Sequence, residues 1–282
     1  MEGEFLVSVQ DAPSDDAQTQ TPDATPEYPA RRVILLGASN LAIHLPAVIA
    51  TARMLWGSPL DVMAALGHGR SYGMTSRVLG RELPGILECG LWRDLRQRPP
   101  APTAALVTDI GNDLLYGVPV EQVAAWVDEC LQRLAPLTPT LIVTELPLES
   151  SQSLTPERFL LLRSIFFPRC RLTFEETLTH TVQLNARVQE IAARYGAAII
   201  KPSLAWYGFD PIHIRRTRGA RVWREILAPW SPDAPPRPAR WTLGQWIALR
   251  RLRPLERRLW GRLQQQPQPA GRLFDGTTVS LY

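Results

Sequence analysis

Short apolar runs recur through the middle of the chain, and they restrict its fold more than any other feature. Each run has few polar interruptions, as expected of strands buried on both faces of a parallel sheet. Segments with the apolar spacing of amphipathic helices lie between the runs. The runs cover residues 32–37, 60–66, 104–110, 140–146 and 197–201, and the helical segments cover 40–56, 74–88, 120–135 and 177–195. This alternation predicts an α/β fold in which helices flank both faces of a five-stranded parallel sheet.

The composition changes sharply on either side of this alternating region. Residues 1–30 are rich in Asp, Thr, Pro and Gln and contain no Lys or Arg, which predicts a disordered acidic leader. Residues 230–282 are rich in Arg and Trp. A chain of 282 residues suffices for one sizeable core. We therefore expect one domain over residues 31–229, with the leader before it and a C-terminal extension after it.

The sequence also bears on cellular location. No apolar stretch approaches the ~20 residues that cross a bilayer, and the start of the chain lacks the basic and apolar parts of a secretory signal. The three cysteines, Cys89, Cys130 and Cys170, are widely spaced and odd in number, which fits neither a disulfide framework nor a metal site. We expect reduced thiols and a cytoplasmic location.

Polar residues follow the predicted strands at their carboxyl ends, where the functional groups of parallel sheets gather. Gly37-Ala38-Ser39-Asn40 follows the first strand. Ser39 can be read as a helix N-cap or as a nucleophile held at the helix N-terminus. The segment GHGRSYG, residues 67–73, follows the second strand and is either a flexible turn or a source of amides for an oxyanion.

Two further motifs follow later strands. Asn112, in TDIGNDLLYG after the third strand, can donate a hydrogen bond to an oxyanion or simply turn the chain. Asp210 and His213 follow the last strand and are three residues apart, so the carboxylate can orient the imidazole across one turn. His44 and His180 lack such a partner and are interpreted as ordinary helix residues.

The order of these motifs, Ser, Gly, Asn and then Asp with His, resembles that of the SGNH (GDSL-type) hydrolase superfamily over about residues 31–227. The resemblance implies a flavodoxin-like three-layer α/β/α domain and cleavage of a carboxylic ester through an acyl-enzyme. It assigns the nucleophile to Ser39, the general base to His213 and its orienting partner to Asp210. The oxyanion hole falls to the amides of Ser39 and Gly69, with Gly67 and Gly73 as alternatives, and to the side chain of Asn112.

One position departs from the superfamily pattern. Ala38 stands where the usual residue before the serine is an aspartate, so the polar contact of that aspartate is absent or is supplied by another group. The resemblance implies a small-molecule or lipid ester as substrate. No clustered metal ligands and no G-x-G-x-x-G motif are present, so no metal or organic cofactor is expected. The rival hypothesis is a non-catalytic binding or scaffold protein of the same fold.

The C-terminal part of the chain is strongly basic. Residues 215–272 contain 14 Arg against three acidic residues. The apolar spacing over residues 243–263 predicts an amphipathic basic helix, bent at Pro254. We expect its apolar stripe to pack on the catalytic domain or on a second copy of the chain, with an anionic membrane surface as the alternative. No nucleic-acid partner is expected, because no recognised DNA or RNA motif accompanies the arginines.

Overall fold

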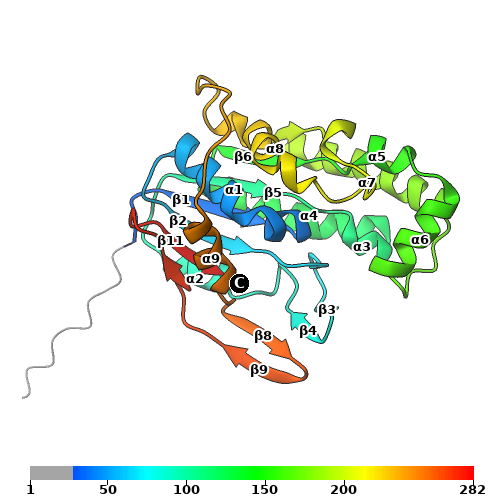
Figure 1. Cartoon of the computed structure of the whole chain (residues 1–282), viewed down its shortest axis with the longest axis horizontal. Helices are drawn as coiled ribbons and strands as arrows, with labels where there is room; N and C mark the ends of the chain where they lie inside the picture. Colours follow the sequence, from blue (N-terminus) through cyan, green and yellow to red (C-terminus); the bar gives the residue numbers. More distant parts are fainter. Residues whose placement is uncertain (1–27) are drawn as a thin grey trace, which may run out of the picture.

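One mixed sheet forms the centre of the molecule, and helices cover both of its faces (Figure 1). The computed structural model describes residues 28–282, so the predicted leader lies outside the described residues except for its last three positions. The five predicted strands are present as β1 (Arg32–Leu36), β2 (Asp61–Ala65), β5 (Thr103–Val107), β6 (Thr140–Thr144) and β7 (Ala198–Ile200). They are parallel and run in the order β2-β1-β5-β6-β7, as in flavodoxin-like sheets. The predicted α/β/α fold class is confirmed.

The sheet has seven strands rather than the predicted five. β11 (Thr278–Leu281) lies parallel to β2, and β10 (Gly271–Arg272) pairs with β11 in the antiparallel sense. Thr278 and Ser280 interrupt the apolar residues of β11, so the strand lacks the continuous run that identified the others. Part of the C-terminal extension therefore belongs to the central sheet.

The helices form the two outer layers of the domain. α2, α3, α4 and α7 pack on the face that carries Ile34 and Leu36 of β1, whereas α1, α8 and α9 pack on the face that carries Val33 and Leu35. The α-helices are α1 (Ser39–Trp56), α2 (Leu91–Gln97), α3 (Asn112–Leu115), α4 (Val120–Leu134), α5 (Leu148–Gln152), α6 (Pro156–Phe166), α7 (Phe174–Arg194), α8 (Gly219–Ile226) and α9 (Leu243–Arg251). Short 3₁₀ helices are η1 (Ala135–Leu137), η2 (Leu204–Trp206), η3 (Arg216–Arg218) and η4 (Ala228–Trp230).

The predicted helix over residues 74–88 is wrong, because this segment contains a hairpin. β3 (Ser76–Val78) and β4 (Arg81–Leu83) pair across Leu79 and Gly80, whose φ angles are 48° and 74°. Two successive positive φ angles are the signature of the tight turns that suit the twist of a hairpin. Apolar spacing alone could not reveal this turn.

The predicted helix over residues 243–263 is also wrong in its second half. α9 ends at Arg251, and the chain continues as the hairpin of β8 (Glu256–Leu259) and β9 (Arg262–Gln265). Trp260 and Gly261 make the turn with φ angles of 50° and 79°. β8 pairs with β4, so the two hairpins form a second sheet of four strands that projects from the domain (Figure 1). The apolar side of α9 packs on the domain through Leu249, which is buried.

No helix within residues 28–282 has both the length and the hydropathy that a membrane span requires.

Candidate active site

The strand order explains why distant segments meet at one edge of the sheet. β2, β1 and β5 are neighbours, so the loops after their carboxyl ends bring Gly69, Ser39 and Asn112 to the same region. Gly37 makes the tight passage from β1 to α1. A Cβ atom at this position would lie 2.8 Å from Leu41 Cδ1 and 2.8 Å from Thr108 Cγ2, so a larger residue would push Ser39 out of place.

Ser39, His213 and Asp210 form a chain of hydrogen bonds. Ser39 Oγ lies 2.9 Å from His213 Nε2, and His213 Nδ1 lies 2.5 Å from Asp210 Oδ2. With Nδ1 protonated and donating to the carboxylate, Nε2 is the acceptor of the serine hydroxyl. Ser39 is the first residue of α1, and the N-cap position is taken by Ala38, whose side chain makes no capping bond. The N-cap interpretation of Ser39 is therefore wrong.

Hydrogen bonds hold the loop that carries His213 on both sides of this residue, at Asp210 and at Ile214. Asp210 Oδ1 accepts hydrogen bonds from the amides of Ile212 and His213, at 3.0 and 3.2 Å. On α1, Asn40 Oδ1 accepts from the Ile214 amide at 2.8 Å, and His44 Nε2 lies 3.1 Å from the Ile214 carbonyl oxygen. Because Asn40 and His44 are one helical turn apart, one face of α1 holds both backbone groups of Ile214.

Asp109 supplies a carboxylate beside Ala38. Its Oδ2 accepts hydrogen bonds from the amides of Ala38 at 3.0 Å and Asn40 at 2.9 Å, and its Oδ1 accepts from Asn40 Nδ2 at 2.7 Å. Asp109 adopts a φ of 59°, which is uncommon outside glycine but more accessible to Asp than to most residues. The start of α1 thus receives its acidic partner from the loop after β5.

Three hydrogen-bond donors on the loops after β1, β2 and β5 have no partner within residues 28–282. They are the amide of Ser39, the amide of Gly69 and the buried Nδ2 of Asn112. Gly69 has a φ of 61°, and its carbonyl accepts from the Tyr116 hydroxyl at 2.6 Å. The alternative Gly73 is less suited to the role, because its amide already donates to Ser71 Oγ at 3.2 Å.

Comparison of the sequence with known families and curated proteins finds no match. One solved structure is 12% identical with a TM-score of 0.50, and the alignment covers 71% of this chain and 96% of that chain. That likeness concerns the fold alone. Together with the strand order, it identifies the architecture. The chain has a flavodoxin-like three-layer α/β/α fold.

Two other solved structures are similar to this chain at lower scores. The psychrotrophic esterase EstA from Pseudoalteromonas sp. is 13% identical with a TM-score of 0.43, over 70% of this chain and 93% of that chain. A carbohydrate acetylesterase family member from Sinorhizobium meliloti is 13% identical with a TM-score of 0.48, over 70% of this chain and 96% of that chain.

Charge at the candidate site is set by burial and by close partners. Burial opposes ionisation of Asp210, but the bond and charge of His213 and the two backbone amides outweigh it and lower the pKa of this carboxyl. Burial lowers the pKa of His44 and of His68, which keeps both rings neutral near pH 7. Within residues 28–282 no group of three or more potential metal ligands is found.

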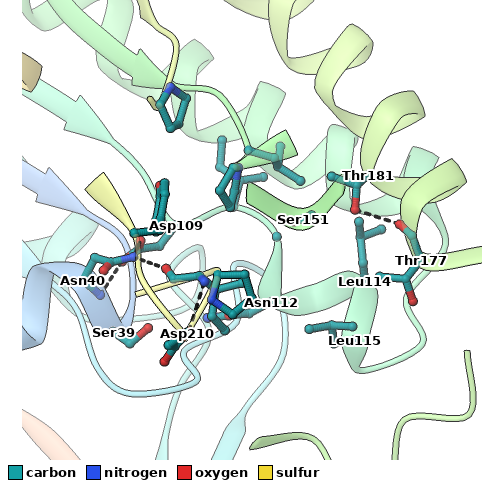
Figure 2. Close-up of a pocket in the computed structure, with 18 of the residues that line it drawn as sticks. Ser39, Asn40, Asp109, Asn112, Leu114, Leu115, Ser151, Thr177, Thr181 and Asp210 are labelled. Atoms are coloured by element: carbon teal, nitrogen blue, oxygen red, sulfur yellow. Dashed lines mark hydrogen bonds between the residues drawn. The ribbon is translucent and has the colours of Figure 1, made fainter. Parts of the chain in front are cut away.

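A cavity of about 130 Å³ opens from Ser39 toward α3, α5, α6 and α7 (Figure 2). Asn112 lies between Ser39 and the far end of the cavity at Thr177 and Thr181 (Figure 2). His213 lines a separate, more open hollow together with His68, Phe209 and Arg216. The site therefore has two neighbouring compartments, which share Phe166, Asp210 and Ile214.

Sequence reasoning did not assign Asn40 and Asp109, which hold the two sides of the site together. Asn40 directly follows Ser39, and Asp109 lies three residues before Asn112 in the same stretch. A signal for Asp109 was present, because Ala38 leaves the start of α1 without its usual carboxylate. Asn40 had no comparable signal, because its hydrogen-bond partners lie about 170 residues away on the loop of His213.

Proposed function

We propose that this protein is a serine esterase that cleaves a small-molecule or lipid carboxylic ester through an acyl-enzyme. The observation that carries the proposal is the 2.9 Å contact between Ser39 Oγ and His213 Nε2, with Asp210 on the other ring nitrogen of His213. A hydroxyl, an imidazole and a carboxylate in this order are the parts of a nucleophile, a general base and its orienting partner.

In the proposed acylation step, Ser39 Oγ attacks the ester carbonyl carbon while His213 Nε2 takes the hydroxyl proton. The carbonyl oxygen becomes an oxyanion, and the unpaired donors on Ser39, Gly69 and Asn112 stabilise it. The carbon–oxygen bond to the alcohol then breaks, and His213 returns the proton to the leaving oxygen. Asp210 stabilises the imidazolium that forms between these events.

Water then completes the reaction. His213 takes a proton from a water molecule as the water oxygen attacks the acyl carbon, and the carboxylic acid leaves as Ser39 Oγ recovers its proton. This cycle uses only side chains and amides of the protein. The rival hypothesis of a non-catalytic scaffold gives no reason for the short Ser39–His213 contact or for the unpaired Asn112 Nδ2 in the cavity that Ser39 lines.

Covalent labelling tests the proposal. A fluorophosphonate should modify Ser39, and Ser39→Ala should abolish labelling and lower turnover of p-nitrophenyl butyrate by about 10⁴-fold or more. Ser231→Ala is the matched control, because Ser231 lies outside both compartments, and it should behave like the wild type. Full turnover by Ser39→Ala would refute the proposal.

A cytoplasmic location is part of the same proposal. Cys89, Cys130 and Cys170 are free and buried, as thiols are kept in a reducing compartment. Imaging of a fluorescent fusion in cells would check it.

A further inference from the structure

The walls of the cavity beside Ser39 are predominantly apolar. Aromatic and aliphatic side chains from four helices and the loops between them face it, among them Leu114, Leu115, Phe159, Leu162, Phe167 and Leu178. Phe159 and Leu162 are the buried residues of α6, and Leu114 is buried on α3. An apolar ligand would replace water against these walls at a gain in free energy.

The threonine hydroxyls in these walls already have partners. Thr177 Oγ1 donates to the Thr173 carbonyl at 2.8 Å, and Thr181 Oγ1 donates to the Thr177 carbonyl at 2.7 Å (Figure 2). Thr108 and Thr144 pair with each other through their hydroxyls at 2.8 Å. A sugar hydroxyl or a peptide group in the cavity would lose its bonds to water without full replacement, which disfavours polar ligands there.

The position of His213 decides which part of an ester occupies the cavity. As general acid, His213 must reach the leaving oxygen, so the alcohol lies on the side of its imidazole. That side is the open hollow, which His213 shares with His68, Phe209 and Arg216. Ser39 and Asn112 line the apolar cavity, which His213 does not, so the acyl chain extends past the oxyanion donor into this cavity.

We propose that the acyl group of the substrate is an unbranched apolar chain, bound in this cavity between α3 and α7. The proposal rests on the esterase function proposed above and specifies its substrate class. A cavity of about 150 Å³ lined by similar side chains holds benzene. The 130 Å³ here therefore suits chains of about four to eight carbons. Acetyl esters leave the cavity unfilled, and chains of about 16 carbons exceed it.

A series of p-nitrophenyl esters tests the chain length. From acetate to hexanoate, kcat/KM should rise by about a hundredfold in total, because each methylene removed from water contributes up to about fourfold. It should then fall beyond about ten carbons as the cavity is exceeded. Thr177→Phe fills the cavity from α7 and should lower kcat/KM for hexanoate by about tenfold or more, a larger factor than for acetate.

Matched variants separate this effect from damage to the fold. Thr179→Phe makes the same change on the exposed side of α7 and should keep the wild-type chain preference. Leu115→Trp fills the cavity from the opposite wall and serves as the second filling variant. Calorimetric titration of Ser39→Ala with hexanoate and with acetate gives a readout that needs no turnover, and hexanoate should bind about tenfold tighter or more.

The outcomes distinguish the two proposals. Labelling of Ser39 with equal kcat/KM for all chain lengths would overturn the acyl-chain proposal and leave the esterase intact. Unchanged hexanoate turnover in both folded filling variants would overturn it in the same way. A wild-type protein that neither reacts with fluorophosphonate nor turns over any ester of the series would overturn the esterase and the acyl-chain proposal with it.

Discussion

At the scale of single residues, the site keeps a carboxylate beside the nucleophile although the sequence has Ala38 in the usual position. Asp109, on the loop after β5, accepts three hydrogen bonds of 2.7 to 3.0 Å. Their donors are the amides of Ala38 and Asn40 and the side chain of Asn40. These bonds fix the turn that presents Ser39 and orient the amide of Asn40. We therefore regard Asp109 as a positioning residue for the nucleophile and for the loop of His213.

Removal of this carboxylate should slow turnover without abolishing it. Asp109→Gly is expected to lower kcat by about 10- to 100-fold, because bonds to a charged acceptor contribute about 1.5–3 kcal/mol. KM should change little, since the cavity walls remain. The measurement is the steady-state hydrolysis of p-nitrophenyl butyrate.

The double variant Ala38→Asp, Asp109→Gly is the control for this role. It restores a carboxylate before Ser39 and gives the left-handed φ of 59° to glycine. Partial recovery of kcat over Asp109→Gly supports the positioning role. A wild-type kcat in Asp109→Gly would contradict it.

Asp113 makes stability depend on pH. Burial raises the pKa of this carboxyl to about 6, although Ser71 and the Tyr72 amide oppose the shift. Between about pH 4 and pH 6 the unfolded chain has lost this proton and the folded protein retains it, so the free energy of unfolding falls as pH rises, by roughly 2–3 kcal/mol. The contribution is constant above about pH 7.

Asp113→Asn should remove this term, because an amide does not titrate. From pH 4 to pH 6, the free energy of unfolding of the variant should therefore rise relative to that of the wild type. At higher pH the difference should stay constant. Urea unfolding at a series of pH values measures it. A difference that does not vary with pH would show that Asp113 does not titrate in this range.

At the scale of elements, α7 illustrates how a local signal fixes a helix that the site depends on. Thr173 and Glu176 form a capping box: Thr173 Oγ1 accepts from the Glu176 amide at 3.2 Å, and Glu176 Oε2 accepts from the Thr173 amide at 2.7 Å. This cap starts α7 at Phe174, a few residues earlier than the apolar spacing alone indicates.

Loss of the cap should destabilise the protein modestly. Thr173→Ala is expected to lower the free energy of unfolding by about 1 kcal/mol, because the first turn loses an acceptor. Thr179→Ala makes the same replacement at an exposed position of α7 and should be neutral or slightly stabilising. Chemical denaturation compares the two, and an equal effect in both variants would argue against the cap.

Elements with strong local signals were predicted, and elements that depend on distant partners were not. β1, β2, β5, β6 and β7 are continuous apolar runs, and each was placed within a few residues. The segments 74–88 and 243–263 both contain apolar residues at helical spacing. The first segment and the second half of the other nevertheless contribute strands to two hairpins that pair with one another. Their turns, Leu79-Gly80 and Trp260-Gly261, each carried a glycine that could have indicated a hairpin.

At the scale of the whole molecule, the C-terminal residues complete the domain. β11 pairs with β2, and Val279, Leu281 and Tyr282 are buried in the two cores. Binding of the basic C-terminal segment to an anionic membrane or to a second copy stays a prediction. A liposome-binding experiment on it requires surface substitutions, since deletion would remove part of the sheet.

Truncation after residue 229 should therefore disrupt folding. Without β11, the edge of β2 and the apolar residues beneath it would be exposed to solvent, which favours aggregation. We expect the truncated chain to aggregate or to lose cooperative unfolding, as measured by size-exclusion chromatography and urea denaturation. A monomeric truncated protein with a wild-type unfolding midpoint would contradict this expectation.

The sequence by itself determined the parallel sheet and the order of the candidate site residues, because buried strands and the residues that follow them are local features. Ser39, Asn112, Asp210 and His213 stay predicted site residues until activity is measured, and the structure brings them together. Only the tertiary structure decided that Asp109 accepts hydrogen bonds at the start of α1, that Asn40 binds the loop of His213, and that β11 joins the sheet. These contacts join segments about 70 to 220 residues apart, and no local pattern encodes such a pairing.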